Sequence, residues 1–453
     1  MTKFGGAALE DGAAVRRVGA FLRRDTGTRQ VLVVSAHRGV TEELRSACVA
    51  ARSGRLAWDA VRVRHRTILR QLELPGDLLD RHLQALRALL AHLAGVGHVD
   101  ARQRDHVLSF GERMSARVVA AHLRAGGIAA AAVDAFDLGL VHHPERPAPA
   151  ESRAEERAAL RDRLLAIEGV PVVTGFVALD PVGDLTTLGP NGSDLTATWL
   201  AEALGASRVE LWKPVPGIFS ADPKLVPDAR RLERIGWEDA AALALQGADV
   251  LHPTAGAPAR RAGIPVRVRG YDAPDEAGTL VSDALEDPRG PLALAHRKNV
   301  AVLDRVTGAE GREHVVRSEL ELLGIELEAQ GLQPLSLVSD GARATLLLPD
   351  GPECARLLQG RTRPGDTWKG GWSQVALIGR GVERDVELAR KLLECAGSEA
   401  RLVPPRAGSR ARSVLVPRER LTDVASRLHA EVLAPAGDPL NASGSSRRGL
   451  RAE

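Results

Sequence analysis

The sequence contains little lysine, little cysteine and no long apolar run. Only six of its 61 basic residues are lysine, which leaves 55 arginines, and Lys3 and Lys213 are the first two lysines along the chain. The three cysteines, Cys48, Cys354 and Cys395, are too scattered for a disulfide framework or a metal-binding pattern. No apolar stretch approaches the roughly 20 residues that span a bilayer, and the glycine-rich start does not resemble a signal peptide. These absences favour a protein of the reducing cytoplasm that does not enter a membrane.

An excess of charge of one sign is also missing. The net charge is +3, although 26% of the residues are charged. So small a net charge argues against nucleic acid or an anionic membrane as a partner. The chain has 453 residues, too many for one hydrophobic core, so we expect roughly two to four domains.

Short apolar runs rich in β-branched residues alternate with helical patterns over the first 285 residues. Buried strands are expected at 31–36, 170–176, 209–212 and 264–268, and a further strand would end at Lys3. Apolar residues recur at helical spacing at 11–24, 55–125 and 193–204. This alternation predicts an α/β fold with a mainly parallel sheet sandwiched by helices.

The elements become shorter beyond a polar stretch near residue 285. Strands are expected at 300–303, 325–329, 335–339 and 342–348, with helices at 313–323 and 352–358. A second series has strands at 374–379, 400–403 and 412–416 and helices at 382–395 and 418–431. We interpret the two series as βαββαβ units of the ferredoxin type. The expected domains are 1–285, 298–365 and 373–435, followed by a Ser/Arg/Gly-rich tail at 437–453 that we expect to be disordered.

The first candidate for chemistry is Lys3-Phe4-Gly5-Gly6, at the end of the first expected strand. Two glycines let backbone N–H groups approach phosphate oxygens, and the lysine beside them can neutralise charge during phosphoryl transfer. Taken alone, the tetrapeptide is equally compatible with a tight turn.

Six segments together carry a specific resemblance. In order and spacing they resemble the signature blocks of aspartate kinases, members of the amino-acid-kinase family. The segments are Lys3-Phe4-Gly5-Gly6, Val34-Ser35-Ala36 with Gly39-Val40-Thr41, Leu108-Ser109-Phe110-Gly111-Glu112-Arg113, Thr186-Thr187-Leu188-Gly189 with Gly192-Ser193-Asp194, Pro216-Gly217-Ile218-Phe219 with Ala221-Asp222-Pro223, and Val250-Leu251-His252-Pro253. The resemblance covers residues 1–285.

The resemblance implies transfer of the γ-phosphoryl group of Mg-ATP to the side-chain carboxylate of L-aspartate, the first step toward lysine, threonine and methionine. It assigns catalysis to Lys3 and Asp194. It assigns ATP binding to Lys3, Phe4, Gly5, Gly6, Gly189, Lys213, Pro214, Phe219 and Lys224. It assigns substrate binding to Ser35, Thr41, Glu112 and Ser193. ATP and Mg²⁺ are the implied cofactors, and no protein ligands for the metal are assigned.

Two of these positions, and His252 of the last signature segment, also have structural interpretations. Glu112 could pair with Arg113 or Arg117 on a solvated helix face. Thr41 could cap a helix that begins at Glu42. For His252 the structural interpretation is preferred over a catalytic one, because the motif that contains it is mainly architectural in the family.

Several ligand positions depart from the family pattern. Ala7-Ala8 stands where the family has Thr-Ser, and Pro190 stands where an arginine grips a substrate carboxylate. The loss of such a charged contact is worth about 1.5–3 kcal/mol. Arg38, in the loop after Ser35, is a candidate replacement for that arginine.

The nucleotide side departs as well. Lys213-Pro214 replaces the Thr-Asp pair that meets the nucleotide, while Phe219 and Lys224 replace a tyrosine and an arginine. Asp249 replaces a lysine and reverses its charge, which would repel ATP unless a cation such as Lys213 compensates.

The two C-terminal units resemble ACT domains. This resemblance implies an amino-acid effector such as lysine or threonine, and it implies a homo-oligomer, with a homodimer as the expected form. They could equally serve packing alone. Three functions therefore remain open for the whole chain. They are a feedback-regulated aspartate kinase, a non-catalytic paralogue that senses amino acids, and a kinase for another small carboxylate.

Overall fold

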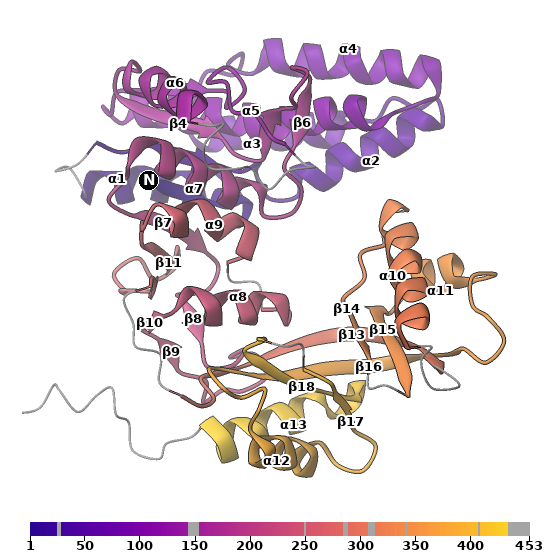
Figure 1. Ribbon diagram of the computed structural model, residues 1–453. Coiled ribbons are helices and arrows are strands. Elements are labelled where there is room, and N and C mark those ends of the chain that lie inside the picture. The colour runs from indigo at the N-terminus through magenta and orange to yellow at the C-terminus, as the bar shows by residue number, and fades with distance from the viewer. Residues whose placement is uncertain are drawn as a thin grey trace, which may run out of the picture. The chain divides into compact units, whose positions relative to one another are not determined.

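The computed structural model describes residues 1–24, 29–143, 154–248, 251–283, 289–306, 313–330, 332–339, 342–405 and 408–433. The chain folds into two compact units, each described by itself (Figure 1). Unit 1 consists of Met1–Ile218, Arg231–Ala244 and Asp249–Glu286, and unit 2 of Phe219–Arg230, Leu245–Ala248 and Asp287–Glu453. Among the described residues, no helix has both the length and the apolar character needed to cross a membrane.

Unit 1 is built on an eight-stranded sheet with the order β10-β12-β11-β7-β1-β2-β4-β3. Its strands are β1 (Thr2–Phe4), β2 (Leu32–Val34), β3 (Ala130–Val133), β4 (Val170–Thr174), β7 (Val209–Lys213), β10 (Arg234–Ile235), β11 (Val266–Gly270) and β12 (Thr279–Val281). All neighbouring strands are parallel except β11 and β12. The central strand β1 runs between β2 and β7, so Lys3 lies in register with Val33 and Leu211.

Helices cover both faces of this sheet. They are α1 (Gly12–Arg24), α2 (Val40–Arg52), α3 (Asp59–Gln71), α4 (Asp80–Val96), α5 (Ala101–Ala125), α6 (Ala154–Leu165), α7 (Gly192–Leu204), α8 (Trp237–Leu245) and α9 (Pro253–Arg261). Two further pairs of short strands form separate two-stranded sheets. They are β5 (Val177–Leu179) with β6 (Leu185–Thr187), and β8 (Ile218–Phe219) with β9 (Arg231–Leu232). Helix α7 packs on β1, β2 and β7 and against α9. The predicted mainly parallel sheet between helical layers is confirmed.

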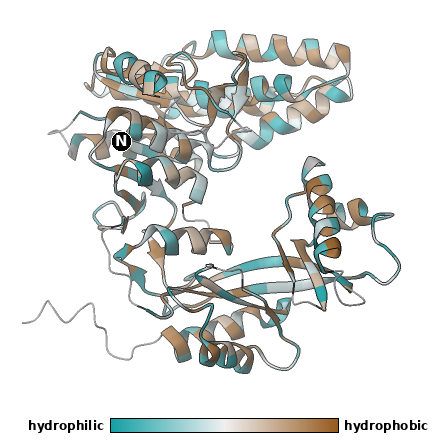
Figure 2. Cartoon of the chain, viewed as in Figure 1, coloured by the Kyte–Doolittle hydropathy of each residue, from teal (hydrophilic) through white to brown (hydrophobic). Residues whose placement is uncertain are grey.

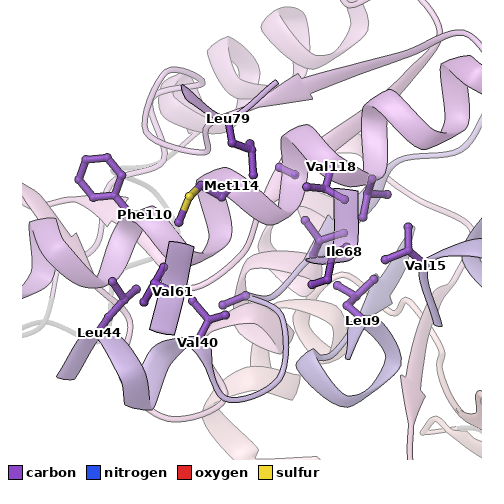
Figure 3. Close-up of a cluster of buried hydrophobic side chains, with 14 of the residues drawn as sticks. Leu9, Val15, Val40, Leu44, Val61, Ile68, Leu79, Phe110, Met114 and Val118 are labelled. Carbon is purple, nitrogen blue, oxygen red and sulfur yellow. The ribbon is translucent and has the colours of Figure 1, made fainter. Parts of the chain in front are cut away.

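The largest core lies on the side of α1 to α5. Figure 3 shows part of it, where Leu44 of α2, Ile68 of α3 and Met114 of α5 lie in one buried cluster. Helices α2 and α3 each bury one face, which is why hydrophobic and hydrophilic residues alternate around them in Figure 2, whereas α5 is buried on most sides along its middle. Helix α5 begins with a capping box between Asp100 and Gln103, in which each side chain accepts a hydrogen bond from the other's backbone N–H.

Unit 2 contains a six-stranded antiparallel sheet with the order β14-β15-β13-β16-β18-β17. Its strands are β13 (Ala293–Val306), β14 (Ser336–Ser339), β15 (Arg343–Pro349), β16 (Thr367–Ile378), β17 (Arg401–Val403) and β18 (Ala411–Pro417). Its helices are α10 (Glu313–Ala329), α11 (Pro352–Leu358), α12 (Val386–Ala396) and α13 (Leu421–Leu428), with short helical turns at Arg418–Arg420 and His429–Leu433. Each predicted series supplies three strands to this sheet. Division into two ACT-like domains stays a prediction, and the tail 437–453 lies outside the described residues.

One predicted strand of unit 2 is wrong. Residues 325–329 are the last turns of α10 and not a strand. The reason is that Leu320, Leu323 and Leu327 continue one helical stripe and are all buried, while Ile325 is 62% exposed. Gly324 does not end the helix, because the buried stripe continues past it.

Unit 2 also includes a segment that the sequence assigned to the first 285 residues. Within Phe219–Arg230, the side chains of Leu225 and Val226 are buried in the same cluster as Leu428 of α13. The Ser220 hydroxyl lies 2.9 Å from Nε2 of His429. Nothing in the sequence pattern indicated that this segment would pack with the C-terminal helices.

Candidate active site

A buried carboxylate between two lysines marks the carboxyl-terminal edge of the unit 1 sheet. Lys3 Nζ lies 2.6 Å from Asp194 Oδ1, and Lys213 Nζ lies 3.2 Å from Asp194 Oδ2. The Asp194 side chain is 2% exposed, and those of the two lysines are 10% and 11% exposed. Lys3 and Asp194, which the resemblance assigns to catalysis, are therefore in direct contact.

The strand register explains why both lysines reach the same carboxylate. Side chains of a strand alternate between its two faces, and residues in register on parallel strands share a face. Lys3 is in register with Leu211. Lys213 follows two residues later on β7 and so lies on the same face, which is the face that α7 covers with Asp194.

The opposite face at this point is aromatic. The rings of Phe4, Phe21 and Trp212 are stacked, with the Phe21 and Trp212 centroids 4.3 Å apart. This stack anchors β1 and β7 beneath the lysines. Because the Phe4 ring is fully buried in it, only the backbone of Phe4 can face a nucleotide.

The charge of Asp194 is fixed by its neighbours. Burial alone would raise the pKa of this carboxyl group, but Lys3 and Lys213 outweigh burial and lower the pKa to about 2. Asp194 is thus a carboxylate at every pH at which the protein would work, and the three charged groups carry a net charge of +1.

Glycines allow the segments around the lysines to pack closely. A Cβ atom on Gly6 would lie 2.9 Å from the carbonyl oxygen of Ala36, and one on Gly175 would lie 2.6 Å from the side chain of Ser193. A Cβ on Gly5 would lie 3.4 Å from Lys3 Nζ. Gly6 and Gly175 are therefore required by close packing within the protein, whereas at Gly5 the backbone beside Lys3 is not crowded and can approach a ligand, as phosphate-binding loops require. Gly189 turns the chain before α7 with φ +70°.

A second group of polar residues meets next to the lysines. The Ser35 hydroxyl donates to Ser193 Oγ at 2.9 Å, and the Ala36 N–H donates to Glu112 Oε1 at 3.1 Å. Burial raises the pKa of Glu112 to about 8, partly opposed by hydrogen bonds from backbone N–H groups and by Lys3. Its other oxygen, Oε2, is buried and has no hydrogen-bond partner among the described residues. This oxygen is available to a ligand cation.

The structural interpretations of Glu112 and Thr41 are wrong. Glu112 is 3% exposed and not on a solvated face, while Arg113 and Arg117 pair instead with the buried Asp134. Helix α2 begins at Val40, so Thr41 is inside its first turn and is not its cap. His252 is exposed at the N-cap position of α9, with Nδ1 2.7 Å from Thr254 Oγ1, a geometry that suits the architectural interpretation.

The remaining expected ligand positions are spread more widely. Pro214 and Pro190 are exposed in unit 1, whereas Phe219 and Lys224 belong to unit 2. Arg38 is exposed, and its guanidinium lies 3.1 Å from Glu10 Oε2. Asp249 lies outside the described residues, so the compensation of its charge by Lys213 stays a prediction.

Two buried histidines beneath the Ser35 loop were missed. His37 and His65 pack with ring centroids 5.4 Å apart, and Nδ1 of each lies close to a backbone carbonyl oxygen, of Leu9 and Val61 respectively. Burial is the main cause that lowers the pKa of His37 to about 3 and that of His65 to about 4. No sequence motif contains both, so only the packing of α3 under the loop reveals the pair.

The charged groups of the site suit an anionic ligand. The described residues contain no cluster of three or more His, Cys, Asp or Glu side chains placed to hold a metal ion. Both oxygens of Asp194 face lysine ammonium groups. Because each oxygen of Asp194 already faces an ammonium group, the cluster suits an anionic ligand.

Comparisons with known proteins identify the family of the chain. The family model described as "Amino acid kinase family" matches residues 2–270. The lysine-sensitive aspartokinase 3 of Escherichia coli is 36% identical over 312 residues, which are 67% of this chain and 68% of that protein. The chain belongs to the aspartokinases of the amino acid kinase family.

Other aspartokinases extend the match. Chloroplastic aspartokinase 1 of Arabidopsis thaliana is 30% identical over 356 residues, or 74% of this chain. The match spans only 62% of that plant protein's length. The crystal structure of E. coli aspartokinase III in complex with aspartate and ADP (R-state) covers 95% of this chain with a TM-score of 0.77 and 28% identity, and 98% of that chain is covered. The structure with lysine and aspartate (T-state) gives the same values. Aspartate kinase of Clostridium acetobutylicum, at 20% identity and a TM-score of 0.72, supports the fold alone.

Proposed function

We propose that this aspartokinase-family protein transfers the γ-phosphoryl group of ATP to the side-chain carboxylate of L-aspartate, giving 4-phospho-L-aspartate and ADP. The observation that carries the proposal is the 2.6 Å contact between Lys3 and Asp194, next to Gly5 and Gly6 at the sheet edge. The E. coli structure named as a complex with aspartate and ADP supports the choice of both ligands. In this proposal the product is the first intermediate toward lysine, threonine and methionine.

The reaction needs little covalent help from the protein. An aspartate carboxylate oxygen attacks the γ-phosphorus, the bond from that phosphorus to the β,γ-bridging oxygen breaks, and the electron pair leaves with ADP. The attacking carboxylate is already ionised, so no general base is required. Bound Mg²⁺ would neutralise phosphate charge. Lys3 stabilises the charge that develops on the transferring group, and Asp194 holds the Lys3 ammonium in place.

Substrate recognition is assigned to the polar group beside the lysines. Oε2 of Glu112 would accept a hydrogen bond from the ammonium group of aspartate. The hydroxyl groups of Ser35, Ser193 and Thr41 would donate hydrogen bonds to its carboxylates. ATP would meet the backbone of Phe4, Gly5, Gly6 and Gly189 together with Lys213, Pro214, Phe219 and Lys224. Pro190 supplies no charge for a carboxylate, and we propose that Arg38 leaves Glu10 to do so. Aspartate affinity that is unchanged in Arg38→Ala would refute this role.

A kinase for a different small carboxylate is the second candidate, and Pro190 favours it. A non-catalytic amino-acid sensor is the third. Trapping of the acyl phosphate with hydroxylamine separates them, because the hydroxamate forms only if a phosphoryl group has reached a carboxylate. Product that depends on aspartate supports the proposal. Product with another acid only supports the second candidate, and no product at saturating ATP supports the third.

Regulation belongs to the proposal as well. We propose that lysine or threonine binds the C-terminal ACT-like region of a homo-oligomer, most simply a homodimer. The E. coli structure named as a complex with lysine in a T-state supports an effector of this kind. Unit 2 also holds Phe219–Arg230 through Ser220 and His429, so a rearrangement in unit 2 would reach Phe219 and Lys224 along the chain. Cytoplasmic location stays a prediction.

A further inference from the structure

Lys213 has a position that the sequence did not anticipate. It was expected to meet the nucleotide in general or to compensate for Asp249, but its ammonium group shares Asp194 with Lys3. The chain contains only six lysines, and two of them meet at this carboxylate. The remaining residues of β7 are apolar or, in the case of Glu210, paired with an arginine. Lys213 therefore differs from its neighbours in the strand, and its role needs an explanation.

Neutralisation of Asp194 does not need two cations. One lysine balances one carboxylate, and a second leaves the cluster with a net charge of +1 in a place where the side chains are at most 11% exposed. An uncompensated buried charge is costly, so such a cluster is most stable when an anion completes it. The two ammonium groups contact different oxygens of the same carboxylate, so both lie beside any anion that binds at this cluster.

The surrounding backbone leaves room for that anion. By continuation of the β1–β7 register, Gly5 lies at the level of Lys213 and carries no side chain on the face that the lysines share. A Cβ there would lie 3.4 Å from Lys3 Nζ and 3.9 Å from the carbonyl oxygen of Trp212. A larger side chain at position 5 would occupy the space beside the Lys3 ammonium group.

We propose that Lys213 is a second catalytic cation, and that Lys3 and Lys213 hold the transferring γ-phosphoryl group between them while Asp194 fixes both lysines. This inference rests on the proposed phosphoryl transfer and deepens it, because it assigns Lys213 to the γ-phosphoryl group and not to the nucleotide in general. A purely structural role would leave Lys213 a partner of Asp194 only. The two roles predict different effects of Lys213 on the affinities for ATP and ADP, because ADP has no γ-phosphoryl group.

The test is calorimetric titration of Mg-ATP and Mg-ADP into the full-length wild type and the variants Lys213→Met, Lys213→Arg and Lys298→Met. Lys298 is an exposed lysine of β13 in unit 2 and serves as the matched control. In Lys213→Met, ATP affinity should fall by about tenfold or more and ADP affinity much less, as expected when a charged contact to one phosphate is lost. Lys213→Arg should restore most of the ATP preference, and Lys298→Met should match the wild type.

Equal losses for ATP and ADP, or no loss for either, would overturn the inference. If Lys213→Met does not fold, Lys213→Gln takes its place, because glutamine keeps a donor to Asp194 without the charge. Its loss of ATP affinity is again compared with its loss of ADP affinity. The readout needs no transfer to aspartate. A wild type that prefers ATP but forms no acyl phosphate therefore refutes the proposed function without refuting the two-lysine site, and a wild type that does not bind Mg-ATP overturns both.

Discussion

Replacement of Glu112 by glutamine should remove the pH dependence of aspartate binding. The pKa of Glu112 is raised to about 8, so the group is mostly protonated at neutral pH and cannot attract an ammonium group well. The carboxylate fraction is about one hundredth at pH 6 and about one tenth at pH 7. If the aspartate ammonium requires the carboxylate, apparent affinity should rise about tenfold between these pH values and level off above pH 8.

The assay is the KM for aspartate from pH 6 to 9, with calorimetry of aspartate binding at pH 7 in buffers of different ionisation enthalpy. The wild type should release about one proton for each aspartate bound, because binding converts a protonated Glu112 into a carboxylate. Glu112→Gln keeps the oxygen that accepts from the Ala36 N–H but loses the titration. It should show a flat pH profile, no proton release and weaker affinity at pH 8. A Glu112→Gln variant that retains the wild-type pH profile would refute the reasoning.

Two further predictions concern stability. His37 and His65 have pKa values of about 3 and about 4 in the fold against 6.5 when unfolded. Their contribution to the free energy of unfolding is therefore complete above pH 6.5 and is lost as pH falls toward 3 for His37 and toward 4 for His65. Urea denaturation should show a loss of roughly 1 kcal/mol per pH unit for each over that window, and a flat profile in the wild type would contradict it. His429→Ala removes one of two hydrogen-bond partners of the Ser220 hydroxyl, the other being the Arg230 N–H. It should lower the free energy of unfolding by about 1–3 kcal/mol, whereas His314→Ala, at an exposed position of α10, should leave it unchanged. Equal effects of the two substitutions in thermal melts would contradict this account.

Much of the fold was predictable because local patterns and packing agree. The apolar runs at 31–36, 170–176 and 209–212 became the parallel strands β2, β4 and β7, since β-branched residues buried on both faces suit a central sheet. The exception, 325–329, contains β-branched Ile325, which suggested a strand. The buried Leu stripe of α10 prevailed over that local preference.

The candidate site was predictable only where the motif residues are contiguous or recognisable as blocks. Lys3, Asp194 and Glu112 were placed by their motifs, and the structure brings Lys3 and Asp194 into contact. The second contact of Asp194, with Lys213, depends on the register between β1 and β7, which one sequence does not contain. The same holds for the packing of Phe219–Arg230 in unit 2, because partners more than 200 positions away decide it.

The central claim is that Lys3 and Asp194 serve phosphoryl transfer to aspartate. Phosphorus-31 NMR of the wild type and of Lys3→Met, each with ATP, Mg²⁺ and aspartate, tests it most directly. An acyl-phosphate resonance should grow together with that of ADP in the wild type and should be absent with a folded Lys3→Met variant. A wild type that yields no acyl phosphate, or a Lys3→Met variant that forms it at the wild-type rate, would contradict the account.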